Sequence, residues 1–187
     1  MTKGSIEETT RLVELRDACA LCSDEKEFAA MVRQQLRPLL PHGSLVAAIV
    51  RIAPELLRRV HAIGVDHPAA ALARLPHELD LAERPTLKRW LDSGEPQLLQ
   101  LPCDADRISA RERRELDALG IRRAALHGRI DLGGIVGSCF IFCHLDEQEN
   151  PPMTQELLRQ VIPPMHEALM RVWRRERPVQ RRQAAGV

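Results

Sequence analysis

Aromatic side chains are scarce in this sequence: of its 187 residues none is Tyr, three are Phe and two are Trp. The core must therefore be built mainly from Leu, Ile, Val and Ala. Nucleic-acid surfaces that stack bases on exposed rings need more aromatic residues than this chain has. The formal net charge is +1, so no overall field would attract nucleic acid or a membrane surface.

Signals of export and of membrane insertion are missing as well. No apolar stretch follows the first basic residue, and no uninterrupted apolar run approaches the roughly 18 residues of a membrane span. Five cysteines without an export signal are expected to be reduced thiols rather than a disulfide framework. We therefore expect a cytoplasmic protein with no membrane partner.

The apolar residues that are present follow two periods. Helical spacing predicts long amphipathic helices at both ends of the chain, and short apolar or alternating runs between them predict strands. Helices are predicted over 6–21, 23–39, 69–75, 85–92, 110–119 and from 154 past 172, and strands over 44–52, 57–65, 97–101, 122–131 and 135–144.

Local residue types support several of these boundaries. Ser109 and Glu112 form a capping box at the start of one helix. Asp131–Gly134 is a hairpin connection, because its glycines can adopt positive φ. Pro163 and Pro164 should kink the last helix rather than end it, since the apolar period resumes at once. Residues 66–120 are punctuated by proline.

Together these elements predict an α/β (α+β) domain with a central antiparallel sheet of about five strands. The first and last helices would cover one face of the sheet, and residues 66–120 would cover the other. The 44% apolar content suffices for a single core of this kind.

The order of the elements and several short motifs resemble a known family. Segments 114–131 and 134–142 look like the helix and hairpin of GAF domains, which are similar to PAS domains in their central sheet. Four further segments resemble the amino-terminal sensor half of LuxR-type bacterial transcription regulators of the EpsA kind, which are associated with exopolysaccharide synthesis: Leu40–Gly43, Trp90–Pro96, His127–Gly128 and Pro163–Val172.

This resemblance implies a signal-input domain over residues 1–175, followed by a basic tail or linker over 176–187. Such domains are not enzymes, and the resemblance implies no cofactor. They bind a small-molecule ligand or a second copy of the chain. Such regulators continue into a helix-turn-helix, which this sequence does not contain. Either the DNA-binding half lies outside this sequence or the chain is a stand-alone sensor that has lost it, and DNA would be bound only through such a helix-turn-helix.

Cys19 and Cys22 are spaced as Cys-x-x-Cys, the pattern of zinc sites and of redox dithiols. No second pair completes four ligands, and buried Cys usually behaves as a small hydrophobic residue. We expect no metal site. A thiol-based redox or metal-binding protein that uses these two residues remains the alternative from another functional class.

Candidate ligand-binding residues come from one strand and from residues 66–120, the segment that we call the cover. Ala125, His127 and Arg129 alternate onto one face of the strand predicted over 122–131, where a small side chain leaves volume and two polar groups could orient a ligand. Trp90 lies in the proline-rich cover. We predict a ligand pocket between that strand face and Trp90, and no catalytic residues.

The terminal helices carry more apolar residues than packing against one face of the sheet should require. These apolar stripes predict a homodimer through these helices, and a dimerisation module that binds no ligand is a further alternative. The stripes consist of Leu12, Leu15 and Cys19 on the first helix and of Ile162, Met165, Leu169 and Val172 on the last.

Overall fold

The computed structural model describes residues 3–131, 133–146 and 150–184. In chain order, its elements are α1 (Lys3–Leu21), α2 (Glu25–Met31), the π-helical turn η1 (Val32–Leu36), β1 (His42–Ala53), β2 (Leu56–Val65), α3 (Ala69–Ala73), β3 (Glu78–Asp80), the 3₁₀ turn η2 (Leu81–Glu83), α4 (Pro85–Ser93), β4 (Gln97–Gln100), α5 (Ala110–Ala118), β5 (Arg123–Ile130), β6 (Val136–Leu145) and α6 (Pro151–Ala184).

The described strands form one antiparallel sheet in the order β3-β2-β1-β6-β5-β4. The predicted fold class is confirmed, with six strands instead of about five. The additional strand is β3, which pairs with residues 56–58 of β2 at one edge. Its three residues, Glu78–Asp80, are too few and too polar to produce a strand period in the sequence.

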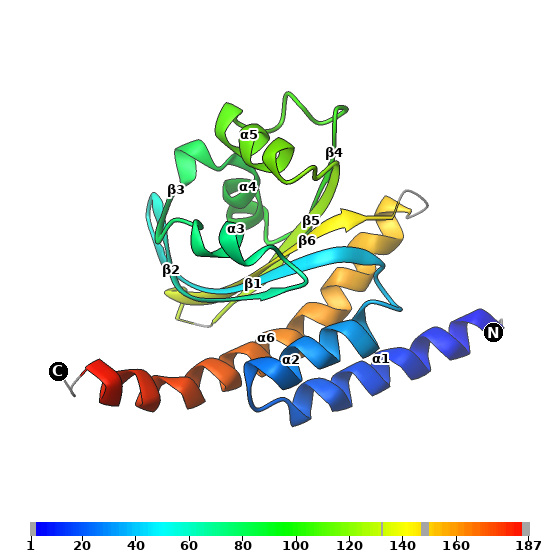
Figure 1. Cartoon of the computed structure of the whole chain (residues 1–187). Coiled ribbons are helices and arrows are strands. Elements are labelled where there is room, and N and C mark those ends of the chain that lie inside the picture. Colours follow the sequence, from blue (N-terminus) through cyan, green and yellow to red (C-terminus); the bar gives the residue numbers. More distant parts are fainter. Residues whose placement is uncertain (1–2, 132, 147–149, 185–187) are drawn as a thin grey trace.

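Helices α1, α2 and α6 lie together on one face of the sheet (Figure 1). Inward-facing residues of β1, β2, β5 and β6 meet the apolar stripes of these helices in the largest core cluster. Phe140 and Phe142 of β6 are fully buried there, together with Leu15 of α1 and Met165 of α6. Burial of these stripes fixes the two long helices against the sheet.

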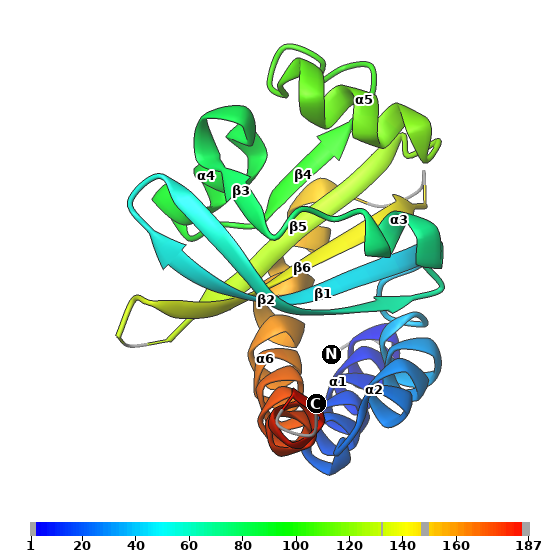
Figure 2. The ribbon, with the colours of Figure 1, turned by 60° about the vertical axis from the view of Figure 1, so that its left-hand side comes forward.

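The other face is covered by α3, α4 and α5 with their connections (Figure 2). Apolar side chains fill the space between this cover and the sheet: Val50, Leu57, Leu81, Leu87, Trp90, Leu126 and Cys139 in one cluster, and Leu99, Ile121, Ala124 and Cys143 in another. The capping box of Ser109 and Glu112 is confirmed at the start of α5. Residues 66–120 thus occupy the predicted position.

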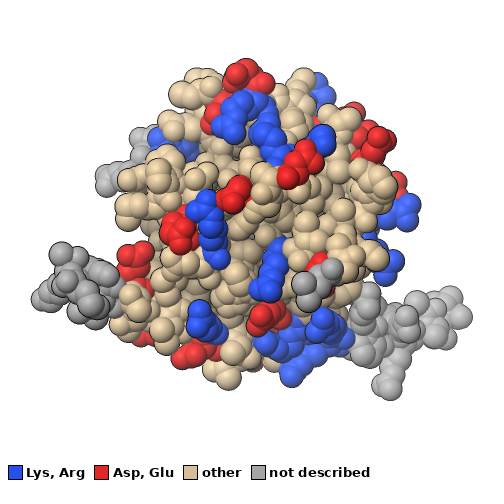
Figure 3. All heavy atoms as spheres, turned by 180° about the vertical axis from the view of Figure 1, so that it is seen from behind, with Lys and Arg blue, Asp and Glu red and all other residues tan. Residues whose placement is uncertain are grey.

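The last helix continues through Pro163 and Pro164, as predicted, and runs on to Ala184. It therefore enters the segment predicted to be a tail, and the division at residue 175 stays a prediction. None of the helices in the described part of the chain has both the length and the apolar character that a membrane crossing requires. Acidic and basic side chains are interspersed over the face seen in Figure 3.

Candidate functional site

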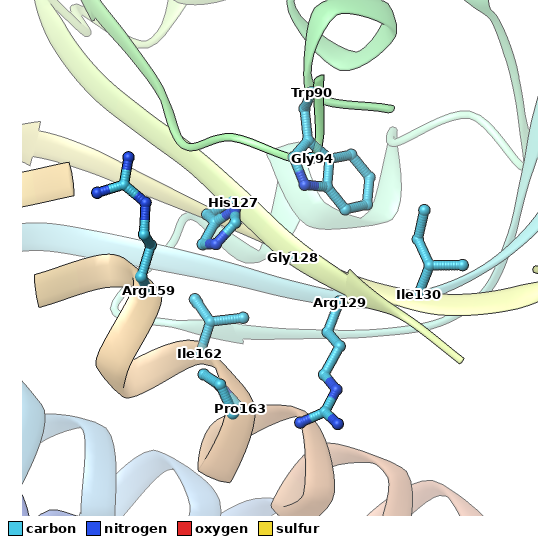
Figure 4. Close-up of a pocket in the computed structure, with 9 residues that line it drawn as sticks. All are labelled: Trp90, Gly94, His127, Gly128, Arg129, Ile130, Arg159, Ile162 and Pro163. Carbon is cyan, nitrogen blue, oxygen red and sulfur yellow. The ribbon is translucent and has the colours of Figure 1, made fainter. Parts of the chain in front are cut away.

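Half of β5 is an open sheet edge. β4 pairs only with residues 123–126 of β5, while the following residues pair with β6 alone. A groove of about 360 Å³ lies along this edge. It is lined from three elements (Figure 4): by Trp90 and Gly94 at α4, by His127, Gly128, Arg129 and Ile130 of β5, and by Arg159, Ile162 and Pro163 of α6.

The groove brings together residues from both faces of the sheet. His127 and Arg129 lie on the face that packs against α6, whereas Gly128 faces the cover and lies beneath the ring of Trp90. The predicted position was therefore wrong in one respect. Trp90 and the strand face of His127 are not opposite walls of an interior pocket, because they meet only around the free edge of β5.

Ala125 is not part of the groove. It is 1% exposed and packs in the core cluster beneath the terminal helices. β4 covers this part of β5, since Leu98 pairs with Ala125. The small side chain is thus enclosed by its neighbours and leaves no volume for a ligand. Of the predicted site residues, the structure brings Trp90, His127 and Arg129 together and separates Ala125 from them.

His127 carries an unsatisfied polar atom. His127 is 7% exposed, and its buried Nδ1 has no hydrogen-bond partner in the described structure. Burial lowers the pKa of His127 to about 4, so the ring is neutral near pH 7. A buried polar atom without a partner costs free energy, and such atoms in proteins usually have a partner. As the ring lies, Nδ1 is closed to solvent, so a turn of the imidazole toward the groove would be needed for it to form one hydrogen bond with a bound molecule.

The two arginines of the groove differ in how their charges are balanced. Arg159 donates to Glu95 through Nη2 at 2.6 Å and to Glu156 through Nη1 at 3.2 Å. Arg129 is exposed and forms no ion pair with any residue that the structure describes. The groove thus offers one guanidinium whose charge is not already compensated.

Ser138, His166 and Asp131 form a hydrogen-bonded group beside the groove. This group was not predicted. Nδ1 of His166 on α6 is 2.8 Å from Oγ of Ser138 on β6, and its Nε2 is 3.0 Å from Oδ1 of Asp131. Ser138 is fully buried in the sheet, so its hydroxyl is closed to substrate and the group resembles a catalytic triad only in composition. It ties α6 to the β5–β6 hairpin.

Sequence reasoning could not find this hydrogen-bonded group, because His166 lies 28 residues from Ser138 and 35 residues from Asp131. The sequence alone does place Ser138 on the same strand face as Phe140 and Phe142, because side chains alternate along a strand. The helical phase that turns His166 toward it depends on how α6 crosses the sheet.

Cys19 and Cys22 are buried between α1 and its neighbours. Burial raises the pKa of Cys19 to about 12 and also raises the pKa of Cys22. Cys22 donates to the carbonyl oxygen of Ala18 at 3.3 Å. A raised pKa disfavours the thiolate that redox exchange and metal binding require, and this burial supports a packing role for both residues.

No protein-family model and no curated protein sequence matches the chain. Solved structures do match. The N-acylhomoserine lactone dependent LuxR family transcription factor CepR2 from Burkholderia cenocepacia has a TM-score of 0.59 at 15% identity, over 88% of this chain and 95% of that one. SdiA from Escherichia coli has a TM-score of 0.60 at 15% identity, over 99% of this chain and 80% of that one.

GAF domains match over a similar length. A phycoerythrobilin-bound GAF domain from a cyanobacterial phytochrome has a TM-score of 0.57 at 12% identity, over 92% of this chain and 99% of that one. Identities this low show the fold alone, and the narrower likeness to EpsA stays a prediction. The chain has the GAF-like sensor-domain fold that is also found in LuxR-type regulators, as its sequence motifs predicted.

Proposed function

We propose that this chain is a signal-input domain of a bacterial transcription regulator, and that it binds a small amphipathic anion in the groove at the free edge of β5. The observation that carries the proposal is the unpartnered Nδ1 of His127 beside this groove. A ligand oxygen or nitrogen that hydrogen-bonds to Nδ1 would remove the cost of leaving it unsatisfied.

The lining of the groove determines the class of ligand. Trp90, Ile130, Ile162 and Pro163 offer apolar surface, and Arg129 offers an uncompensated positive charge. A carboxylate or phosphate would pair with Arg129 while an apolar body lies along the ring and the aliphatic side chains. The volume of about 360 Å³ is near the lower end of the roughly 300–1,000 Å³ of ligand sites, so the ligand is small.

The signal would leave the domain through α6. This helix lines the groove with Arg159, Ile162 and Pro163, and it continues for about six more turns to Ala184. A ligand that contacts both β5 and α6 would change how α6 packs on the sheet. In this proposal the domain works in the cytoplasm, and DNA is contacted only by a helix-turn-helix elsewhere in the regulator.

Homodimerisation through α1 and α6 is part of the proposal, but the residues that support it differ from those in the sequence-based prediction. Leu15, Cys19, Ile162, Met165, Leu169 and Val172 are buried inside a single chain, so they are not surplus apolar surface. Val13 and Leu21 of α1 remain 52% and 80% exposed, and they offer the contact. Light scattering at micromolar concentrations should give a dimer that Leu21→Glu weakens, whereas a monomer throughout would contradict it.

Calorimetric titration with two matched probes tests the ligand proposal. Octanoate and octanamide share an apolar tail, and only octanoate is charged. We expect octanoate to bind more tightly by about 1.5–3 kcal/mol, the range for a hydrogen bond to a charged group, and Arg129→Gln to abolish the difference. Arg114→Gln, an exposed arginine of α5 outside the groove, is the matched control. Equal affinities for the two probes would contradict the role of Arg129.

A further inference from the structure

His61 of β2 is a mostly buried ring whose Nε2 makes no hydrogen bond in the described structure. It pairs with Ile49 of β1 and lies on the sheet face that the terminal helices cover. Its side chain is 10% exposed, and its Nε2 is buried without a hydrogen bond in the described structure. Nothing in the proposed ligand groove involves this residue.

Two carboxylates approach this nitrogen from different helices. Oε1 of Glu25, in the first turn of α2, lies 3.4 Å from Nε2 of His61, and Oε2 of Glu176, on α6, lies 3.8 Å from it. The three ligand atoms all lie within 4.8 Å of one another. Segments that are far apart in the sequence thus place one nitrogen and two oxygens around a common point.

The distances match those that a metal ion imposes. Ligand atoms about 2.0–2.1 Å from a tetrahedral ion stand about 3.4 Å from one another. The His61–Glu25 distance already has this value, and the His61–Glu176 distance of 3.8 Å needs only a small side-chain adjustment. Glu25 is exposed and Glu176 is half-buried, so an ion and a completing water can enter from solvent.

The charges in the cluster favour a cation. Burial, followed by the negative charge of Glu25 and a hydrogen bond to it, raises the pKa of Glu176, and Asp24 adds further repulsion. Burial lowers the pKa of His61, although Glu25 opposes this and Arg59 reinforces it. An imidazole nitrogen that faces two carboxylates is a suitable metal ligand, and a cation between the two carboxylates would offset their mutual repulsion.

We propose that Glu25, His61 and Glu176 bind one divalent transition-metal ion, with water completing the coordination. An imidazole ligand beside two carboxylates suits Zn²⁺ better than Ca²⁺ or Mg²⁺, which prefer all-oxygen sites. The ion would join α2, the sheet and the last part of α6. It would thereby fix the position of the helix that leaves the domain, and this role does not depend on the ligand groove.

Zinc uptake by the full chain tests the site. The protein, purified without a polyhistidine tag and stripped with a chelator, is dialysed against Zn²⁺, and bound metal is measured by atomic emission. We expect one ion per chain. His61→Gln should weaken binding by more than about 100-fold, because even changes behind the ligands cost 10- to 100-fold. Glu176→Gln, nearer the surface, should do the same if His61→Gln fails to fold.

Matched controls separate this site from the cysteines. Glu167→Gln changes an exposed glutamate of α6 outside the cluster and should retain the ion, as should the double variant Cys19→Ala/Cys22→Ala. Cobalt substituted for zinc should give a tetrahedral spectrum without a thiolate charge-transfer band. No stoichiometric uptake, unchanged uptake in His61→Gln and Glu176→Gln, or a thiolate band would each overturn the proposal.

Discussion

The indole of Trp90 lies against the backbone of Gly128. A Cβ atom added at Gly128 would stand 2.6 Å from Cζ2 of Trp90 and 2.1 Å from the carbonyl oxygen of Ser138. Contacts this short do not occur, so the close approach of α4 to β5 depends on the missing side chain. Because the ring is also a wall of the groove, this contact links the cover to the candidate ligand site.

Gly128→Ala should therefore destabilise the domain. The new methyl group must displace the ring of Trp90 or the neighbouring strand, at a cost of about 1–3 kcal/mol for overpacking. Urea unfolding measures the loss, and in the Trp173→Phe background a shift of Trp90 emission reports the moved ring. Gly133→Ala is the control, since a Cβ there meets nothing within 4 Å. Equal stabilities of the two variants would show that the contact is looser than described.

The double variant Cys19→Ala/Cys22→Ala should keep its fold and oligomeric state. Both thiols are buried and have raised pKa values, so their removal costs packing alone, about 1–3 kcal/mol in the free energy of unfolding. Circular dichroism and urea unfolding provide the measurement, and Cys103→Ala, at an exposed cysteine, provides the control. Loss of structure together with a stoichiometric metal would mean that the pair is a ligand set.

Acid should destabilise the protein between about pH 7 and about pH 4. Burial lowers the pKa of His42, His61, His67, His127 and His166. The unfolded chain then binds more protons than the folded chain once the pH falls below the ordinary histidine value, so the free energy of unfolding decreases as the pH falls.

His127 should account for a measurable share of this loss. Its pKa falls from 6.5 to about 4, which corresponds to at most roughly 3 kcal/mol between those two pH values. Urea unfolding of His127→Gln at several pH values should give a shallower pH dependence than the parent chain. If the two slopes are the same, the ring is protonated in the folded state or more accessible than its burial indicates.

Periodicity and local signals were enough to predict most of the fold. The apolar run at 44–52 produced the central strand β1, and the capping box at Ser109 located the start of α5. These features depend on neighbours in sequence. The strand β3 was missed because its pairing with β2 comes from tertiary contact and not from its own three residues.

The candidate site was less predictable. Alternation correctly grouped Ala125, His127 and Arg129 on one strand face, but it could not show that β4 begins only opposite Leu126 and leaves the rest of β5 without a neighbour on that side. The extent of β4 leaves Ala125 covered, whereas the edge of β5 is open from His127 onward. Likewise, the cluster of Glu25, His61 and Glu176 depends on how α2 and α6 cross the sheet, which no local pattern records.

Fluorescence titration of the Trp173→Phe variant with octanoate tests the central claim most directly, because Trp90 is then the only emitter. We predict a saturable change in emission with one octanoate bound per chain. His127→Ala in the same background should weaken binding by about 1–3 kcal/mol, the range for losing a buried hydrogen-bond partner, without unfolding the domain. An emission that does not respond, or a response of equal affinity in His127→Ala, would contradict a ligand site in this groove.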